Sequence, residues 1–166
     1  MPATRKKLSI VTPCYNEEGN AQAMHEAVRD IVRALPGGYD YEHIFIDNCS
    51  KDQTAAILRR IAASDHNVKV ILNARNFGHI RSPHHAILQS TGDAVIILAS
   101  DFQYPPQMIR DFVQKWEEGF KVVLGVKNET EESAAMFFVR KLYYDFIARM
   151  SDVQLTKNNT GFGLYD

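Results

Sequence analysis

Two side chains that could hold a metal, Asp101 and Gln103, follow directly after an apolar run of the chain. A carboxylate and an amide oxygen two residues apart can share one hard cation such as Mg2+ or Mn2+. The run before them, residues 93–99, is short, β-branched and uninterrupted, which is typical of a strand buried on both faces of a parallel sheet. Pro105 and Pro106 suit the first turn of a helix. The pair is therefore expected in a strand-to-helix loop, where open α/β sheets bind their ligands.

A simpler role for Asp101 is that of the N-cap of the helix that follows. The spacing alone supports the metal ligand and the N-cap about equally, and one side chain could serve both roles.

Strands and helices alternate along the chain that must position this loop. This order implies βαβ units, a mainly parallel sheet with helices on both faces, and strand-end loops gathered at one edge. Ser82 and Pro83 are expected as the N-cap and first residue of the third helix. Hydrophobic patterns predict strands at 8–12, 41–47, 68–72, 94–99 and 121–126, and helices at about 24–35, 57–61, 82–90, 108–116 and 136–150.

Each strand-end loop carries groups able to bind a base, a ribose, a phosphate or a metal. Loops are polar in any protein because they are exposed. Polar groups after every strand, with Tyr15, Arg75, Asp101 and Lys127 among them, nevertheless favour a ligand site at the shared edge. The loops comprise residues 13–18, 47–50, 73–78, 100–103 and 127–129.

Composition sets bounds on the class of protein. With 166 residues, 45% apolar and 23% charged, the chain is expected to form one compact domain over 1–166. A net charge of -1 gives no footprint of nucleic-acid binding. The apolar runs are too short for a membrane span or a signal peptide, so a cytoplasmic location is expected, with Cys14 and Cys49 as reduced thiols.

Several function classes lack their signature. No G-x-G-x-x-G follows the first strand and no G-x-x-x-x-G-K-[ST] occurs, which disfavours a dehydrogenase and a P-loop enzyme. His79, His84 and His85 lack the spacing of a helical zinc site. Arg75 and Arg81 flank the segment Asn76–Gly78 and could reach a diphosphate, or could simply be solvated.

Four motifs follow the first four predicted strands in order. They are PCYNEE at 13–18, IDNCSKDQT at 46–54, NFG at 76–78 and DFQYPP at 101–106. Together they resemble family 2 glycosyltransferases of the GT-A fold, and most closely the polyprenyl-phosphate glycosyltransferases of the dolichol-phosphate mannose synthase type. The resemblance covers essentially the whole chain and implies a three-layer α/β/α, Rossmann-like nucleotide-sugar-binding domain. It also implies a divalent metal on the donor diphosphate and sugar transfer with inversion.

The resemblance also assigns roles to residues. Pro13, Tyr15 and Glu17 match positions that hold the nucleotide, and Arg75 is expected beside them. Asn48 matches a position, commonly Asp, that pairs with the base. The metal ligands by this match are Asp101 and Gln103, and the basic residues that face phosphate are Lys127 and Arg140.

Two residues and the chain length depart from the family pattern. Ala99 stands where the first acid of the D-x-D triplet is expected, and Asn48 stands in place of an acid. Related enzymes continue past residue 166, often into membrane-associating helices, so we expect a truncated catalytic domain whose full-length form is peripheral at the inner face of the membrane. A homo-oligomer is also compatible with the sequence.

The expected activity is transfer of a sugar, with UDP-sugars favoured as donors, to a polyprenyl phosphate. One alternative is a glycosyltransferase acting on a sugar hydroxyl in polysaccharide or cell-envelope synthesis, for which Asp166 is a candidate base. Another is a catalytically silent nucleotide-sugar-binding domain, to which the loss of an acid at Ala99 points.

Overall fold

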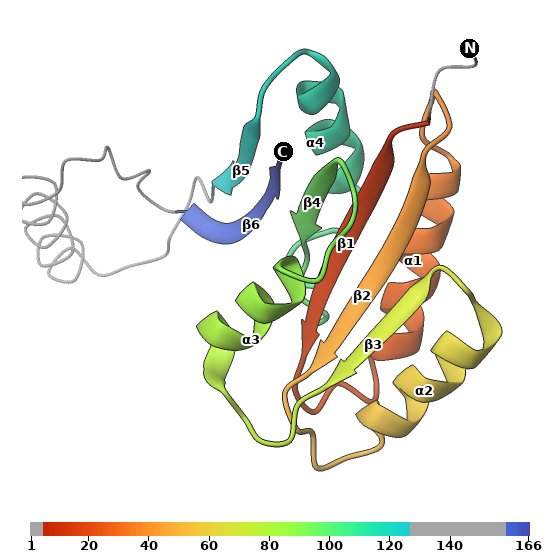
Figure 1. The fold of residues 1–166 in the computed structure, drawn as a ribbon, viewed down its shortest axis with the longest axis vertical. Coiled ribbons are helices and arrows are strands. Elements are labelled where there is room, and N and C mark those ends of the chain that lie inside the picture. Colours follow the sequence, from red (N-terminus) through yellow and green to blue (C-terminus); the bar gives the residue numbers. More distant parts are fainter. Residues whose placement is uncertain (1–4, 127–158) are drawn as a thin grey trace, which may run out of the picture. The chain divides into compact units, whose positions relative to one another are not determined.

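The computed structural model describes residues 5–126 and 159–166 and shows alternating strands and helices (Figure 1). The elements are β1 (Lys7–Cys14), α1 (Ala21–Arg33), β2 (Asp40–Asp47), α2 (Thr54–Ser64), β3 (Val68–Leu72), α3 (Gly78–Ile87), β4 (Ala94–Ile97), α4 (Met108–Glu117), β5 (Val122–Val126) and β6 (Asn159–Tyr165). The helix predicted at 136–150 lies outside the described residues.

The strands form one six-stranded sheet in the order β3-β2-β1-β4-β6-β5. The prediction of a mainly parallel sheet is confirmed, because β1 pairs in parallel with β2 and with β4, and β2 pairs in parallel with β3. Strand β6 pairs antiparallel with β4, with Ile96 opposite Leu164. The sequence did not predict β6, because two of its seven residues are glycines and only Phe162 and Leu164 carry an alternating apolar signal.

Packing divides the chain into two units, residues 1–123 with 162–166, and residues 124–161. The described part of the second unit is the end of β5 and the beginning of β6. All statements about the core and the functional site concern the first unit.

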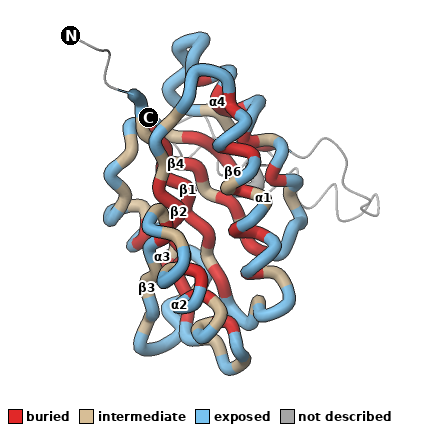
Figure 2. The backbone as a smooth tube through the Cα atoms, turned by 90° about the vertical axis from the view of Figure 1, so that its right-hand side faces the viewer, coloured by how far each residue is buried: buried red, intermediate tan, exposed pale blue. Residues whose placement is uncertain are grey.

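Both faces of the sheet in the first unit are covered, as the continuous apolar strands require (Figure 2). The larger core lies between the sheet and helices α1, α2 and α4, and it includes Leu8, Phe45 and Trp116. The smaller core joins Val11, Ile44 and Ile46 of the strands to Ala86 of α3. The predicted α/β architecture with helices on both faces is thus confirmed.

Helix α3 begins at Gly78, five residues before the predicted first residue Pro83, so the assignment of Ser82 and Pro83 as its N-cap and first residue was wrong. The side-chain oxygen of Asn76 accepts a hydrogen bond from the backbone N–H of Gly78 at 2.8 Å, which forms a turn where the helix starts. The Ser82 hydroxyl instead accepts a hydrogen bond from Asn73 Nδ2 at 2.9 Å. Pro83 therefore lies inside the helix.

A buried carboxylate holds the amino edge of the sheet together. Glu42 accepts hydrogen bonds from the Ser9 hydroxyl and the Thr91 backbone N–H, both at 2.6 Å, and its other oxygen lies 2.5 Å from Lys69 Nζ. Burial alone would raise the pKa of Glu42, but the bonds from Lys69, Ser9 and Thr91 lower it to about 2. Glu42 is therefore a charged residue with a structural role. It lies near the amino end of β2, away from the carboxyl edge of the sheet.

Candidate active site

The carboxyl ends of β1, β2, β3 and β4 lie at the same edge of the sheet (Figure 1). A pocket of about 390 Å3 opens there. Its walls come from the loops after β1, β2, β3 and β4 and from the beginning of α3. The lining residues are Pro13, Cys14, Tyr15, Glu17, Asn48, Asn76, Gly78, His79, Ser82, Pro83, Ala99, Ser100 and Asp101.

The loops after β1 and β2 are joined by backbone-to-side-chain hydrogen bonds. The backbone N–H of Glu17 donates to Thr54 Oγ1 at 2.8 Å, and that of Asn16 donates to the Ser50 hydroxyl at 2.8 Å. In return, the N–H of Lys51 donates to Asn16 Oδ1 at 2.8 Å. The two loops therefore form one frame, which fixes the backbone that carries Tyr15 and Glu17.

Asp47, at the end of β2, supports this frame from beneath. It is buried and accepts hydrogen bonds from both the backbone N–H and the hydroxyl of Ser50. The Ser50 hydroxyl also accepts a hydrogen bond from the Asn16 backbone N–H. Asp47 therefore helps to position the loop after β1 as well as the loop after β2. Asp47 thus serves the frame, while Asn48, the next residue, reaches the pocket.

Three residues in these loops adopt the left-handed backbone conformation without being glycine. They are Asn16 (φ 57°), Cys49 (φ 66°) and Phe102 (φ 56°), one in each of the loops after β1, β2 and β4. Such a conformation costs free energy and persists where surrounding contacts impose it, often at ligand sites. Its recurrence around one pocket supports a functional role for this edge.

The predicted metal ligands lie in the loop after β4. Asp101 lines the pocket and is exposed, and its Oδ1 accepts a hydrogen bond from the Gln103 backbone N–H at 3.1 Å. Helix α4 starts only at Met108 and has no side-chain cap, so Asp101 is not its N-cap. Among the residues that the structure describes, no three His, Cys, Asp or Glu side chains gather as a ready metal cage. This sparse arrangement fits Mg2+ or Mn2+, which bind through one or two protein carboxylates and substrate phosphates.

The thiol in the pocket wall is not a candidate nucleophile. Burial raises the pKa of Cys14 to about 12, with a smaller opposing effect from Ser100. The thiol therefore stays protonated at neutral pH, and nucleophilic chemistry needs the thiolate.

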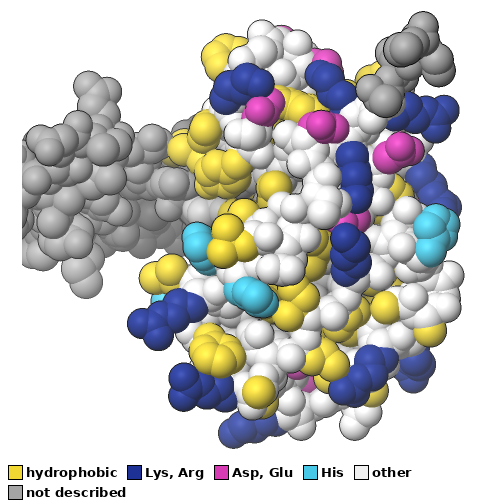
Figure 3. Space-filling model, in the orientation of Figure 1, with side chains coloured by type: hydrophobic (Ala, Val, Ile, Leu, Met, Phe, Trp, Pro, Cys, Tyr) yellow, Lys and Arg dark blue, Asp and Glu magenta, His cyan; other side chains and the backbone are white. Residues whose placement is uncertain are grey.

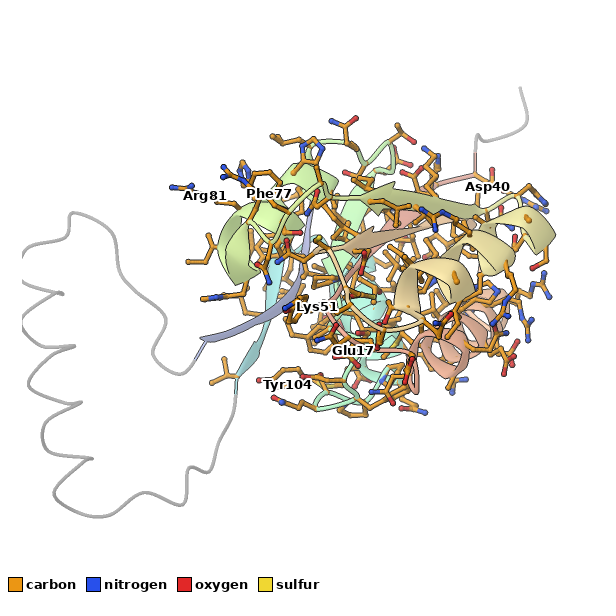
Figure 4. The ribbon with its side chains drawn as sticks, turned by 90° about the horizontal axis from the view of Figure 1, so that it is seen from below. Glu17, Asp40, Lys51, Phe77, Arg81 and Tyr104 are labelled. Atoms are coloured by element: carbon orange, nitrogen blue, oxygen red, sulfur yellow. The ribbon has the colours of Figure 1, made fainter. Side chains whose placement is uncertain are left out.

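The structure brings most of the predicted donor-binding residues together. Pro13, Tyr15, Glu17, Asn48 and Asp101 all line the pocket. Figure 4 views the molecule from this edge, with Glu17 and Lys51 in the two joined loops, Phe77 just before α3 and Arg81 on α3.

Arg75 and Gln103, two further predicted site residues, are not among the described residues that line the pocket. The guanidinium of Arg75 lies over the ring of Phe77, 4.8 Å from its centroid, and Gln103 is exposed. Lys127 and Arg140 lie outside the described residues. Asp166, the candidate base for a hydroxyl acceptor, accepts hydrogen bonds from Trp116 Nε1 at 2.6 Å and Lys121 Nζ at 2.7 Å, so its described contacts are structural.

Sequence reasoning missed the contribution of α3 to the pocket. His79, Ser82 and Pro83 line it, although the sequence had suggested a solvated or capping role for His79 and a helix-capping role for Ser82. The signal that could have found them is their position directly after the NFG segment at 76–78, which forms the adjoining wall.

Comparison with known proteins agrees with this geometry. Residues 9–162 match the family described as Glycosyl transferase family 2. The match covers most of the chain, and the protein belongs to this family. The predicted GT-A fold is thereby confirmed, together with the resemblance to polyprenyl-phosphate glycosyltransferases among its relatives.

Two curated relatives extend beyond this chain. An uncharacterized glycosyltransferase, sll0501 of Synechocystis sp., is 32% identical over 161 residues, which are 96% of this chain and 50% of the relative. An undecaprenyl-phosphate 4-deoxy-4-formamido-L-arabinose transferase of Shewanella sediminis is 35% identical over 154 residues, 89% of this chain and 44% of the relative. The chain thus spans about half the length of the curated relatives it matches.

A solved structure shares the fold. Glucosyl-3-phosphoglycerate synthase from Mycobacterium tuberculosis, in complex with Mn2+, UDP and glucosyl-3-phosphoglycerate, superposes with a TM-score of 0.65 at 19% identity. The superposition covers 97% of this chain and 57% of that one.

Proposed function

We propose that the protein transfers a sugar, with inversion, from a nucleotide sugar to a polyprenyl phosphate. The observation that carries this proposal is the pocket at the carboxyl edge of the sheet, where Tyr15 and Glu17 of the loop after β1 meet Asp101 of the loop after β4. In open α/β sheets this edge is the ligand-binding edge.

The donor nucleotide would occupy the part of the pocket between the loops after β1 and β2. Tyr15 is 42% exposed there and offers a flat aromatic face with a hydroxyl, which suits a base or ribose. Pro13 and Glu17 flank it, and Asn20 Nδ2 donates to Glu17 Oε2 at 2.8 Å, which holds that carboxylate in place. UDP is the favoured nucleotide, by analogy with the Mycobacterium tuberculosis synthase.

The diphosphate would lie toward Asp101, with Gln103 as a second oxygen donor to a divalent cation. A bound Mg2+ or Mn2+ would neutralise charge that develops on the leaving nucleoside diphosphate. Asp101 would hold that cation at the pocket wall, and no second acid stands at Ala99 to share the task. Arg75 is proposed as an additional partner of the phosphates, if its side chain leaves the Phe77 ring.

A polyprenyl phosphate would need little help from a base. Its phosphate is already largely anionic near neutral pH, because the second pKa of a phosphate monoester is about 6. Lys127 and Arg140 are the proposed cations for this group, since two positive charges would screen its repulsion from the donor diphosphate. The formamido-arabinose transferase of Shewanella sediminis supports this class of acceptor, because that relative is named an undecaprenyl-phosphate transferase.

Exposed apolar side chains on and beside α3 support the proposal that the protein binds at a membrane surface. Ile80 is 72% exposed and Leu88 67% exposed, and Phe77 is also exposed. The stretch 73–91 contains no Asp or Glu and includes Arg75 and Arg81. Figure 3 shows hydrophobic, histidine and basic side chains side by side over this region. In the part of the chain that the structure describes, no helix is both long and apolar enough to cross a membrane.

A silent nucleotide-sugar-binding domain is the second candidate, favoured by the single acid of the Ala99–Asp101 triplet. The test is a thermal-shift panel of UDP, GDP, CDP and dTDP with and without Mn2+, followed by transfer assays of the full-length protein with a polyprenyl phosphate. A true ligand should raise the free energy of unfolding by about 2 to 3 kcal/mol at a hundredfold excess over Kd. Nucleotide binding without turnover would favour the silent domain, and no binding at all would overturn the proposal.

A further inference from the structure

Asn48 lies at the end of β2 and forms a dense set of hydrogen bonds with the segment that leads into α3. Its Oδ1 accepts from the backbone N–H of Phe77 at 2.9 Å and from Asn73 Nδ2 at 3.3 Å. Its Nδ2 donates to Asn76 Oδ1 at 2.8 Å and makes a longer contact of 3.4 Å with the Gly78 carbonyl oxygen. A primary amide has two acceptor and two donor positions, and all of them are engaged here.

The direction of these bonds is fixed by backbone groups. The Phe77 N–H can only donate, so the atom of Asn48 that faces it must be oxygen. The Gly78 N–H donates to Asn76 Oδ1 at 2.8 Å, so the atom of Asn76 at the centre of the network must also be oxygen. Exchanging the oxygen and nitrogen of either amide would place its NH2 group against a backbone N–H, so that two hydrogen-bond donors would face each other. The orientation of both amides is therefore determined.

This polarity makes the two positions unequal. Position 48 must supply a donor toward position 76, whereas position 76 needs to supply only an acceptor. A carboxylate at 76 would preserve both bonds made by Asn76 Oδ1. A carboxylate at 48 would place its oxygen against Asn76 Oδ1 and the Gly78 carbonyl, with no hydrogen to donate.

The held segment is a wall of the pocket. Asn76, Gly78 and His79 all line it, and Asn48 itself is only 7% exposed. Asn73, at the start of the segment, also donates to the Ser82 hydroxyl, which ties the same network to the body of α3. The network therefore sets how far this wall lies from the loop that carries Tyr15.

We propose that Asn48 is a positioning residue that holds the segment 73–78 as a wall of the donor pocket, and that it does not read the base. A base that paired with Asn48 would have to displace bonds to Phe77 or Asn76. This inference rests on the proposed function, because it concerns the pocket proposed for the nucleotide.

The test compares Asn48→Asp with Asn76→Asp in the full-length protein. The two variants add the same charge on partners of one hydrogen bond, so they are matched in electrostatic effect on a bound diphosphate. Hydrogen exchange is followed in peptides that cover 73–79, and affinities are measured for UDP, GDP, CDP and dTDP. We expect Asn48→Asp to accelerate hydrogen exchange in these peptides. We also expect it to lower the affinity for every nucleotide that binds by the same factor, about ten. We expect Asn76→Asp to keep the exchange of this segment close to that of the wild type.

Distinct outcomes overturn the proposal. If Asn48→Asp changes the ranking of the nucleotides, the side chain reads the base. If exchange over 73–79 does not change, the side chain does not hold the segment. Should Asn48→Asp fail to fold, Asn76→Ala, at an exposed position, removes the acceptor of both Asn48 and Gly78 and should release the same peptides. If the wild type binds none of the four nucleotides, the proposed function fails while the exchange comparison still decides the role of Asn48.

Discussion

The hydroxyl of Thr12 and Nε2 of His43 lie 2.9 Å apart across β1 and β2, and both residues are completely buried. The His43 ring also packs near that of His25, with centroids 6.1 Å apart, and His25 Nε2 lies 3.7 Å from Asp65 Oδ2. Nδ1 of both histidines has no hydrogen-bond partner among the described residues. The core beside α1 therefore contains two imidazoles that fit as neutral rings.

Acid should destabilise the fold through His43. Burial, with a further contribution from the nearby His25, lowers the pKa of His43 from 6.5 to about 3, and burial also lowers the pKa of His25 despite Asp65. The unfolded chain therefore binds protons that the folded chain does not. Stability should be level above pH 6.5 and fall as pH drops from 6.5 toward 3, by up to about 1.4 kcal/mol per pH unit for each proton.

This dependence can be measured by urea unfolding between pH 5 and 8. His43→Gln should reduce the slope, because Gln does not titrate. His66→Gln, at an exposed position, is the control for loss of a histidine outside the core. An equal slope in wild type and His43→Gln would place the acid sensitivity elsewhere.

Asp101→Asn should abolish the Mn2+-dependent part of nucleotide affinity while leaving the fold intact, because Asp101 is exposed and would be the principal charged ligand of the cation. Gln103→Ala should weaken it less, since a neutral amide oxygen is the poorer ligand. Calorimetric titration of UDP with and without Mn2+ measures both. Asp111→Asn, an exposed acid in the first turn of α4, is the control for loss of charge. Unchanged metal dependence in Asp101→Asn would refute the assignment.

Tyr15→Ala should weaken nucleotide binding whatever sugar the donor carries. Stacking of a base on an aromatic side chain is worth about 1 to 3 kcal/mol by alanine substitution. That range corresponds to a loss of roughly 5- to 150-fold in affinity. Tyr15→Phe keeps the flat face and should retain most of the affinity. If both variants bind like the wild type, the base lies away from Tyr15.

Thr54→Val should loosen the loop that carries Glu17. The Thr54 hydroxyl is buried, accepts from the Glu17 N–H at 2.8 Å and donates to Asp52 Oδ1 at 2.5 Å. Valine has nearly the same shape but leaves the Glu17 N–H without its acceptor, while Asp52 Oδ1 keeps only its hydrogen bond from the backbone N–H of residue 54. We therefore expect a cost of about 1 to 2 kcal/mol in unfolding free energy together with weaker nucleotide binding. Thr54→Ser keeps the hydroxyl and should restore binding. Loss of stability without loss of affinity would mean that the frame does not govern the pocket.

Arg140→Gln addresses the acceptor. If Arg140 meets the lipid phosphate, this change should raise KM for a polyprenyl phosphate much more than KM for the nucleotide sugar, and added salt should reduce the difference. Steady-state kinetics of the full-length enzyme at two ionic strengths provide the measurement. Equal changes in both KM values would move Arg140 to the donor side. Transfer to an uncharged sugar alone would replace the acceptor class.

The sequence by itself determined the alternation of the first five strands with the helices, the parallel direction of the first four strands and the edge at which the site lies. These features follow from local apolar periodicity and from the geometry of βαβ units, which need no knowledge of distant contacts. The motifs carrying Tyr15, Glu17 and Asp101 could be placed at one pocket for the same reason.

The tertiary structure alone decided how individual polar atoms are used. The sequence predicts Ser82 as a helix cap, but in the structure Asn73 donates a hydrogen bond to its hydroxyl and α3 begins at Gly78, before Ser82. The sequence predicts that the Asn48 amide pairs with the base of a ligand. In the structure, groups 25 to 30 residues away along the chain occupy its donors and acceptors. Such outcomes depend on which groups meet after folding, because a buried polar atom bonds to whatever partner packing brings within about 3 Å, and local sequence does not name that partner.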